Sequence, residues 1–201
     1  MARGAEGSLE EANLNYIVAL LYLAGGCLSR LKIQKGLFIA STVVPYLSNV
    51  LVFREGGLGP WSPQVAAVLS RLRALGLVQL GRRSVCLRDA SSAEVALGKL
   101  PVSDREGIGD VAELLSVASD DEVLLYVYVL HGGDRWPGME RRVSTRRTEL
   151  AISLLAKGAV SLSLAARLAG MSLDDFVKEL RRRGVKPFRA HPEDIEFAKK
   201  L

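Results

Sequence analysis

The basic side chains of this sequence form short runs that suit contact with the phosphates of a nucleic acid. Arginine presents a planar fork of N–H donors that fits phosphate oxygens, and each such contact releases counterions from the duplex. The candidates for phosphate contact are Arg82, Arg83, Arg141, Arg142, Arg146, Arg147, Lys178, Arg181, Arg182 and Arg183. We therefore expect double-stranded DNA to be a partner of this chain.

The residue types that catalysis or metal binding needs are not arranged in a pattern that supports either. His131 and His191 are the two histidines, and neither has a cysteine or carboxylate nearby at the spacing of a metal site. No serine lies in a nucleophile elbow, and the sequence GGLGP lacks the lysine of a phosphate-binding loop. We expect no catalytic residue, no metal, no cofactor and no enzymatic activity.

The elements that must position Arg82 and Arg83 follow the order of a winged helix. The predicted elements are helices over 9–24, 30–42 and 63–75, and a β-hairpin formed by 77–80 and 84–88. Ser62 followed by Pro63 is a strong helix start, because serine caps the helix and proline fits its first turn. This order predicts a winged-helix-like domain in the N-terminal half.

On the third of these helices, outward side chains are the candidates for reading base edges, since this helix of a winged helix lies in the major groove. These candidates are Gln64, Ser70 and Arg71. On the preceding helix over 30–42, Gln34 and Lys35 are expected to face partly outward. The Gly- and Pro-rich segment 54–61 is predicted to be a loop, with Trp61 at its end as an anchor in the core.

The same region resembles the winged-helix-like module of the Panacea antitoxins and related YwgA-type proteins. The resemblance is carried by LKIQKGLFIA followed by GLGPWSPQVAAVLSRLRALGLVQL. The matching positions are Ile33, Gln34, Lys35, Gly59, Pro60, Trp61, Ser62 and 75–77. It implies a winged-helix-like fold, and winged helices serve both to bind DNA and to bind other proteins.

Residues 150–185 are predicted to form three short helices with helix-turn-helix spacing. Ala165 and Ala166 let two helices lie close together, and Gly170 allows a left-handed turn between them. Ser172 can then cap the last helix. These features predict a helix-turn-helix module at the C-terminal end.

The segment KGAVSLSLAARLAGMSLDDFVKELRRRGV resembles a family of short, largely uncharacterised archaeal and bacterial proteins that are regarded as antitoxin-like. The matching positions are Lys157, Gly158, 165–170, Met171, Ser172, Phe176, Arg183 and Gly184. The resemblance implies a helix-turn-helix module with an antitoxin-like regulatory role.

Three acidic residues of this module favour a protein partner over DNA. Asp174 and Asp175 fall in the first turn of the last helix, where carboxylates are repelled by phosphates. Glu179 falls where DNA-reading helix-turn-helix segments usually have a buried aliphatic residue. The alternative to a DNA-binding regulator is therefore a protein-interaction module, an antitoxin or adaptor that binds a toxin or another protein without reading DNA.

Charge is distributed unevenly along the 201 residues, a length that suits two modest domains. Residues 101–134 carry eight acidic side chains against one arginine, whereas 135–201 carry fifteen basic against eight acidic ones. We predict a mainly α chain with a winged-helix-like domain and acidic helical extension over 9–131, a linker over 132–147 and a helix-turn-helix module over 148–201.

Cysteine usage and apolar runs set expectations about location and assembly. Cys27 and Cys86 are the two cysteines, and we expect both to be buried thiols of a cytoplasmic protein. The apolar run over 16–24 is too short to cross a membrane, so no membrane association is expected. The stretch VLLYVYVL within 121–131 suits either a buried helix or the seam of a homodimer.

Overall fold

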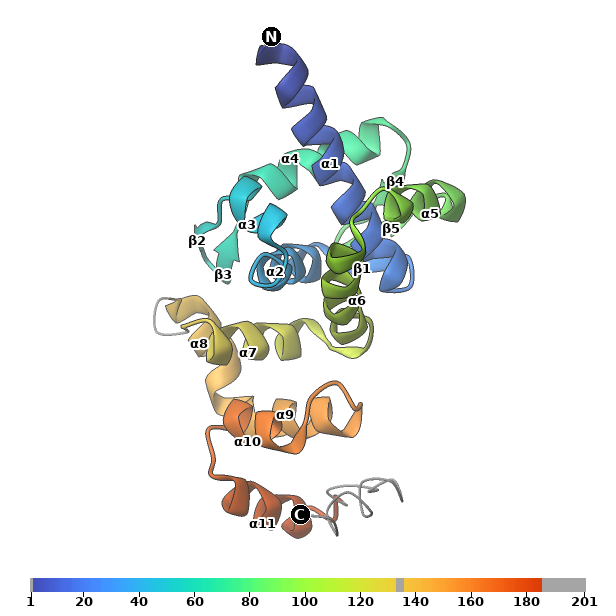
Figure 1. Ribbon diagram of the computed structural model, residues 1–201. Coiled ribbons are helices and arrows are strands. Elements are labelled where there is room, and N and C mark those ends of the chain that lie inside the picture. Colours follow the sequence, from blue (N-terminus) through green and yellow to red (C-terminus); the bar gives the residue numbers. More distant parts are fainter. Residues whose placement is uncertain (1, 133–135, 186–201) are drawn as a thin grey trace. The chain divides into compact units, whose positions relative to one another are not determined.

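The chain is mainly helical, as predicted, and carries two small antiparallel sheets (Figure 1). The computed structural model describes residues 2–132 and 136–185. Two compact units divide the chain, unit 1 over Met1–Thr145 and unit 2 over Arg146–Leu201. The segment predicted as a linker, 132–147, differs from that expectation because it contains a helix of unit 1, Pro137–Val143.

Unit 1 holds most of the secondary structure. Its helices are α1 (Ala2–Leu23), α2 (Arg30–Ala40), α3 (Pro45–Val50), α4 (Pro63–Ala74), α5 (Ala90–Gly98), α6 (Val102–Val117), α7 (Asp120–Leu130) and α8 (Pro137–Val143). Its strands are β1 (Cys27–Ser29), β2 (Arg54–Gly56), β3 (Gly59–Trp61), β4 (Val78–Leu80) and β5 (Ser84–Leu87).

The core of unit 1 lies where α1, α2 and α6 meet, because each presents an apolar face to the others. Leu20, Leu37 and Leu115 are each fully buried there. At Gly36 a Cβ atom would run into the Leu115 side chain, so the missing side chain lets α2 approach α6 closely. Helix α7 buries four apolar residues of 123–127 within unit 1. Its apolar sequence suited either a buried helix or the seam of a homodimer, and this burial agrees with the first.

A three-stranded antiparallel sheet with the strand order β1-β5-β4 packs against α1 and α2 in unit 1. Strands β4 and β5 pair through Val78 with Leu87 and Leu80 with Val85, which confirms the predicted hairpin. Strand β1 pairs on the other side of β5, with Cys27 opposite Cys86. The hairpin turn is therefore held at one end of a sheet whose central strand is β5.

The expectation of two buried thiols is wrong. Cys27 and Cys86 form a disulfide with 4.1 Å between their Cα atoms, and Cys27 is exposed. The two residues are 59 positions apart in sequence, and their pairing follows from the register of β1 and β5. The inference from reduced thiols to a cytoplasmic location therefore loses its premise.

The segment predicted as a loop over 54–61 is a second hairpin, formed by β2 and β3. Its turn lies against α8, because a Cβ on Gly138 would overlap the carbonyl group of Gly57. Gly59 has φ +84°, and a Cβ there would overlap the Met139 side chain. The glycines thus serve two local needs, a left-handed backbone and a close approach of two chain segments.

Unit 2 contains three helices, α9 (Arg147–Ala156), α10 (Leu162–Ala169) and α11 (Leu173–Arg182), preceded by a 3-10 turn (Ser144–Arg146). The predicted turn is confirmed, since Gly170 adopts the left-handed conformation with φ 74°. Ser172 caps α11 by accepting a hydrogen bond from the Asp175 backbone N–H. Phe176 and Leu180 are fully buried in this small helical core.

Among the helices of the described ranges, none combines the length and the apolar character that crossing a bilayer requires.

Candidate nucleic-acid interface

Helix α4 presents two of the three predicted base-reading residues to solvent. Its start is fixed as predicted, with Ser62 accepting a hydrogen bond from the Val65 backbone N–H at 3.4 Å and Pro63 in the first turn. Val65, Val68, Leu69 and Leu72 are buried. The opposite face exposes Ser70 and Arg71. Arg71 has the longest reach of any exposed side chain at this predicted face.

Gln64 is less available than predicted. It is half-buried, and its side-chain Oε1 accepts a hydrogen bond from the Ser62 hydroxyl at 2.9 Å. The Ser70 hydroxyl also has a local partner, since it donates to the Ala66 carbonyl at 3.1 Å. The Ser70 hydroxyl would have to give up its hydrogen bond in order to donate to a base edge, whereas Gln64 can still donate through Nε2.

A buried polar contact joins α2 to the start of α4, contrary to the expectation that Gln34 and Lys35 face outward. The Gln34 side-chain amide donates to the Ser62 carbonyl at 3.0 Å and accepts from the Ser62 backbone N–H at 2.9 Å. Lys35 Nζ donates to the Pro60 carbonyl at 2.7 Å. Both side chains are buried, with 7% and 4% of their surface exposed. These bonds position the first turn of α4 against α2.

The turn between β4 and β5 carries the two arginines that are best placed for phosphate contact. Arg82 and Arg83 are exposed, and neither side chain makes an ion pair or hydrogen bond within the described part of the chain. Arg30 supports this turn by donating its backbone N–H to the Arg83 carbonyl at 3.0 Å and its guanidinium to the Gly81 carbonyl at 3.3 Å. The supporting role of Arg30 has no signal in the sequence pattern.

Three of the four predicted arginines over 141–147 form an ion pair or a hydrogen bond with another residue of the protein. Arg142 pairs with Asp121 at 2.6 Å, and Arg146 pairs with Glu149 at 2.8 Å. Arg147 donates to the Leu168 carbonyl at 2.9 Å. This carbonyl lies in the last turn of α10, where carbonyl groups have no hydrogen-bond partner within the helix. Arg141 is exposed, and no partner for its side chain is found in the ranges that the structure covers.

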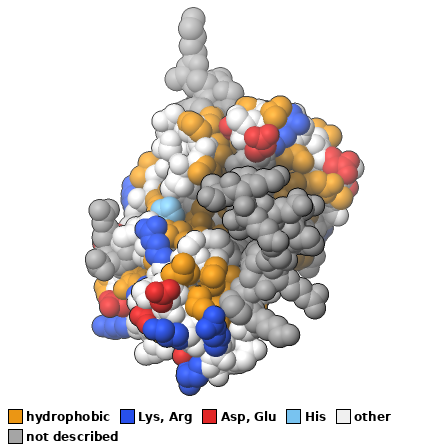
Figure 2. Space-filling view, turned by 60° about the horizontal axis from the view of Figure 1, so that its bottom comes forward, with side chains coloured by type: hydrophobic (Ala, Val, Ile, Leu, Met, Phe, Trp, Pro, Cys, Tyr) orange, Lys and Arg blue, Asp and Glu red, His pale blue; other side chains and the backbone are white. Residues whose placement is uncertain are grey.

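The basic residues of α11 are largely paired with carboxylates of the same helix. Glu179 binds Arg182 at 2.7 Å and Arg183 at 2.5 Å, and these two arginines lower the pKa of Glu179 to about 2. Lys178 lies 3.3 Å from Asp175, and the pKa of Asp175 is lowered by the Ser172 hydroxyl and by Lys178. Both basic (blue) and acidic (red) side chains lie on the face of the molecule that Figure 2 shows.

Within this group of residues, Arg181 is exposed and has no side-chain partner in the described ranges. The predicted contact residues are divided between the two units, with those from Gln64 to Arg142 in unit 1 and those from Arg146 to Arg183 in unit 2. The described ranges also hold no group of three or more His, Cys, Asp or Glu side chains that could bind a metal ion.

The described elements define a mainly helical protein with two small antiparallel sheets. Residues 139–197 match UPF0175, an uncharacterised protein family. Two UPF0175 proteins of Aeropyrum pernix are similar to this chain. One is 47% identical over 45 residues, which are 22% of this chain and 57% of that relative. The other is 42% identical over 69 residues, which are 32% of this chain and 74% of that relative.

Through this C-terminal part, the chain belongs to the UPF0175 family. The family match starts at residue 139 and thus leaves most of unit 1 outside it. The resemblance of the N-terminal part to the Panacea module stays a prediction. No solved structure matches the chain.

Proposed function

We propose that the chain is a DNA-binding regulatory protein whose unit 1 is a winged helix. The observation that carries the proposal is the sheet order β1-β5-β4 together with the element order α1, β1, α2, α4, β4 and β5. A winged helix has a helix-turn-helix followed by a hairpin that pairs with an earlier strand. Helix α3 and the β2–β3 hairpin are then an insertion between the second and third helices of that arrangement.

In this proposal α4 enters the major groove and the β4–β5 turn contacts the backbone beside it. Arg71 and Ser70 are the exposed candidates for base edges, and Gln64 is a weaker one because it is half-buried. Arg82 and Arg83 supply the phosphate contacts. Since no ion pair has to break first, their full charge is available to the duplex.

The experiment is fluorescence anisotropy with duplex DNA from the region upstream of the chain's own gene and with a scrambled duplex, over a salt series. Arg82→Ala and Arg83→Ala should each reduce the salt slope by about one. Arg88→Ala is the matched control, because Arg88 is also exposed and without a side-chain partner in the described ranges but follows the opposite end of β5. No binding at low salt, or equal effects of all three variants, would refute the proposal.

Unit 2 carries a second candidate function, the binding of a protein partner through a helix-turn-helix formed by α10 and α11. The pairing of Arg182 and Arg183 with Glu179 leaves little free positive charge on α11. At its start, Met171 and Leu173 are 37% and 48% exposed. An apolar surface beside paired charges suits a protein interface better than a phosphate backbone. This agrees with an antitoxin-like role.

This second function is tested by co-expression with the protein encoded by the adjacent gene, followed by size-exclusion chromatography. Met171→Ser combined with Leu173→Ser should abolish the complex while DNA binding by the full chain persists. Val95→Ser combined with Val102→Ser is the control, because these two exposed apolar residues lie in unit 1. A complex that survives the unit 2 substitutions would count against this interface.

A further inference from the structure

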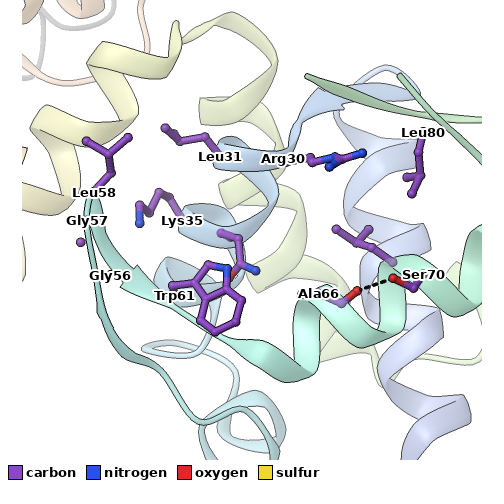
Figure 3. Close-up of a pocket in the computed structure, with 13 residues that line it drawn as sticks. Arg30, Leu31, Lys35, Gly56, Gly57, Leu58, Trp61, Ala66, Ser70 and Leu80 are labelled. Atoms are coloured by element: carbon purple, nitrogen blue, oxygen red, sulfur yellow. Dashed lines mark hydrogen bonds between the residues drawn. The ribbon is translucent and has the colours of Figure 1, made fainter. Parts of the chain in front are cut away.

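A pocket of about 590 Å³ lies between α2, α4 and the β2–β3 hairpin of unit 1. Figure 3 shows Leu31 and Lys35 reaching toward it from α2, with Trp61 from β3 and Ser70 from α4. A volume of this size is typical of sites for small molecules, which bury most of the ligand. Of the proposed DNA contacts, Ser70 alone lines this pocket, so the proposed DNA binding does not account for it.

The walls of the pocket are mainly apolar. They are formed by Leu31, Leu58, Trp61, Ala66, Leu69 and Leu80. Trp61 was expected to be a core anchor, but its side chain is 43% exposed and lines this space. An indole face of this kind can stack on a flat ring of a ligand. The walls thus select for apolar molecules of modest size.

Of the two charged residues that line the pocket, Lys35 is the buried one. Lys35 lines the pocket and is 4% exposed, which is rare for a lysine without a carboxylate partner. Its ammonium group has three donors, and the Pro60 carbonyl at 2.7 Å is its single partner among the residues that the structure describes. A buried cation without an opposite charge is unfavourable, and an anion in the pocket would relieve that cost.

We propose that this pocket binds a small, largely apolar carboxylate whose anionic group pairs with Lys35. The hydrocarbon part of the ligand would occupy the space between Trp61 and the leucines, and the carboxylate would accept the two free N–H donors of Lys35. Arg30 is the other ionisable residue that lines the pocket, and its guanidinium donates to the Gly81 carbonyl at 3.3 Å. This site goes beyond the proposed DNA binding and can be tested without DNA.

The pH dependence of ligand binding gives a second test, because the charge of Lys35 depends on pH. Burial lowers its pKa from 10.5 to about 8, so the free protein loses the ammonium charge above that pH. A carboxylate that pairs with Lys35 should therefore bind with an affinity that is constant well below pH 8 and falls as pH rises through it. Binding driven by the apolar walls alone would show no such decline.

The experiment is isothermal titration calorimetry of the full chain with naphthalene-2-carboxylate and with its neutral amide as the matched probe. The carboxylate should bind about tenfold tighter than the amide, and Lys35→Met should abolish the difference. Lys32→Met is the control for the same change on the same helix, since Lys32 does not line the pocket and instead donates to the Leu115 carbonyl. Ala66→Phe, which fills the pocket but keeps Lys35, should weaken both probes.

Equal affinity for the acid and the amide would overturn the proposal, as would unchanged carboxylate binding in Lys35→Met. Absence of carboxylate binding at millimolar concentration would overturn it too. Circular dichroism of each variant checks that the fold is retained. Because DNA plays no part in these titrations, their failure and the failure of the proposed DNA binding are separate results.

Discussion

The β4–β5 turn of unit 1 and helix α11 of unit 2 both carry consecutive arginines, yet the two regions differ in how available those charges are. Arg82 and Arg83 are unpaired in the described ranges, whereas Arg182 and Arg183 share Glu179. The number of arginines in a run therefore does not predict its capacity for phosphate contact. What matters is whether a carboxylate lies three or four residues away on the same helix.

The two regions are also held in place by different means. Unit 1 fixes its turn through a sheet with a disulfide between β1 and β5, and fixes α4 through the amide of Gln34. Unit 2 positions α11 through the Ser172 cap, which has a counterpart in the Ser62 cap of α4, and through the left-handed Gly170. Four predictions test this contrast.

The largest effect is expected from the disulfide. Replacing Cys27 and Cys86 by Ser should lower the free energy of unfolding of unit 1 by about 2–4 kcal/mol, because the bridge restricts the unfolded chain. Urea unfolding with and without a reductant measures this. Unit 2 contains no cysteine and is the internal control. Two outcomes would contradict this prediction: a reductant that shifts the unfolding transition of unit 2 as much as that of unit 1, and a reductant that shifts neither.

The second effect concerns DNA affinity. Arg82→Ala combined with Arg83→Ala should weaken DNA binding roughly tenfold or more at low salt, since two free charges are lost. Arg182→Ala combined with Arg183→Ala should change it little, because these charges are already paired. Anisotropy titrations of both double variants give the comparison. A larger loss from the α11 pair would reverse our assignment of the two regions.

The third effect compares how α4 and α11 begin. Gln34→Leu leaves the buried N–H of Ser62 without its partner and leaves the Ser62 carbonyl with the Ala66 N–H alone, and should cost about 1–3 kcal/mol. Ser172→Ala removes an exposed cap from α11 and should cost about 1 kcal/mol. Thermal unfolding of each variant ranks them. If Ser172→Ala lowers the free energy of unfolding more than Gln34→Leu does, the Gln34 contact stabilises the protein less than its burial indicates.

The smallest effect lies at Glu179. Its lowered pKa means that its ion pairs stabilise the protein fully above pH 4.5, and that this contribution is lost as pH falls toward 2. Glu179→Gln should remove this part of the pH dependence and free Arg182 and Arg183 for weak DNA contact. Urea unfolding at several pH values between 2 and 5 measures it. Glu113→Gln, at an exposed glutamate of α6, is the control and should keep the wild-type profile.

Sequence patterns predicted those features whose cause is local. Ser62 with Pro63, the turn at Gly170 and the cap at Ser172 each depend on residues a few positions apart, and the structure confirms all three. The β4–β5 hairpin was predicted for the same reason. The β2–β3 hairpin was missed because its glycines and proline are typical of loops, while their actual role depends on the approach of α8.

Features that depend on distant partners were not predictable. The burial of Gln34 and Lys35 requires the backbone of 60–62, and the disulfide requires the register of two strands 59 residues apart. The pairing of Glu179 with Arg182 and Arg183 was in principle visible, since their spacing of three and four residues brings them together on a helix. That spacing is the signal to use when judging arginine runs.

The bridge between Cys27 and Cys86 has a consequence for any study of the protein by limited digestion. It encloses α2, α3, the β2–β3 hairpin and α4 in one covalent ring. A single cut within this ring leaves both pieces joined, so the digested protein would migrate near its full mass until a reductant is added. Exposed positions in the ring, including the turn that bears Arg82 and Arg83, can therefore be cleaved without release of a fragment.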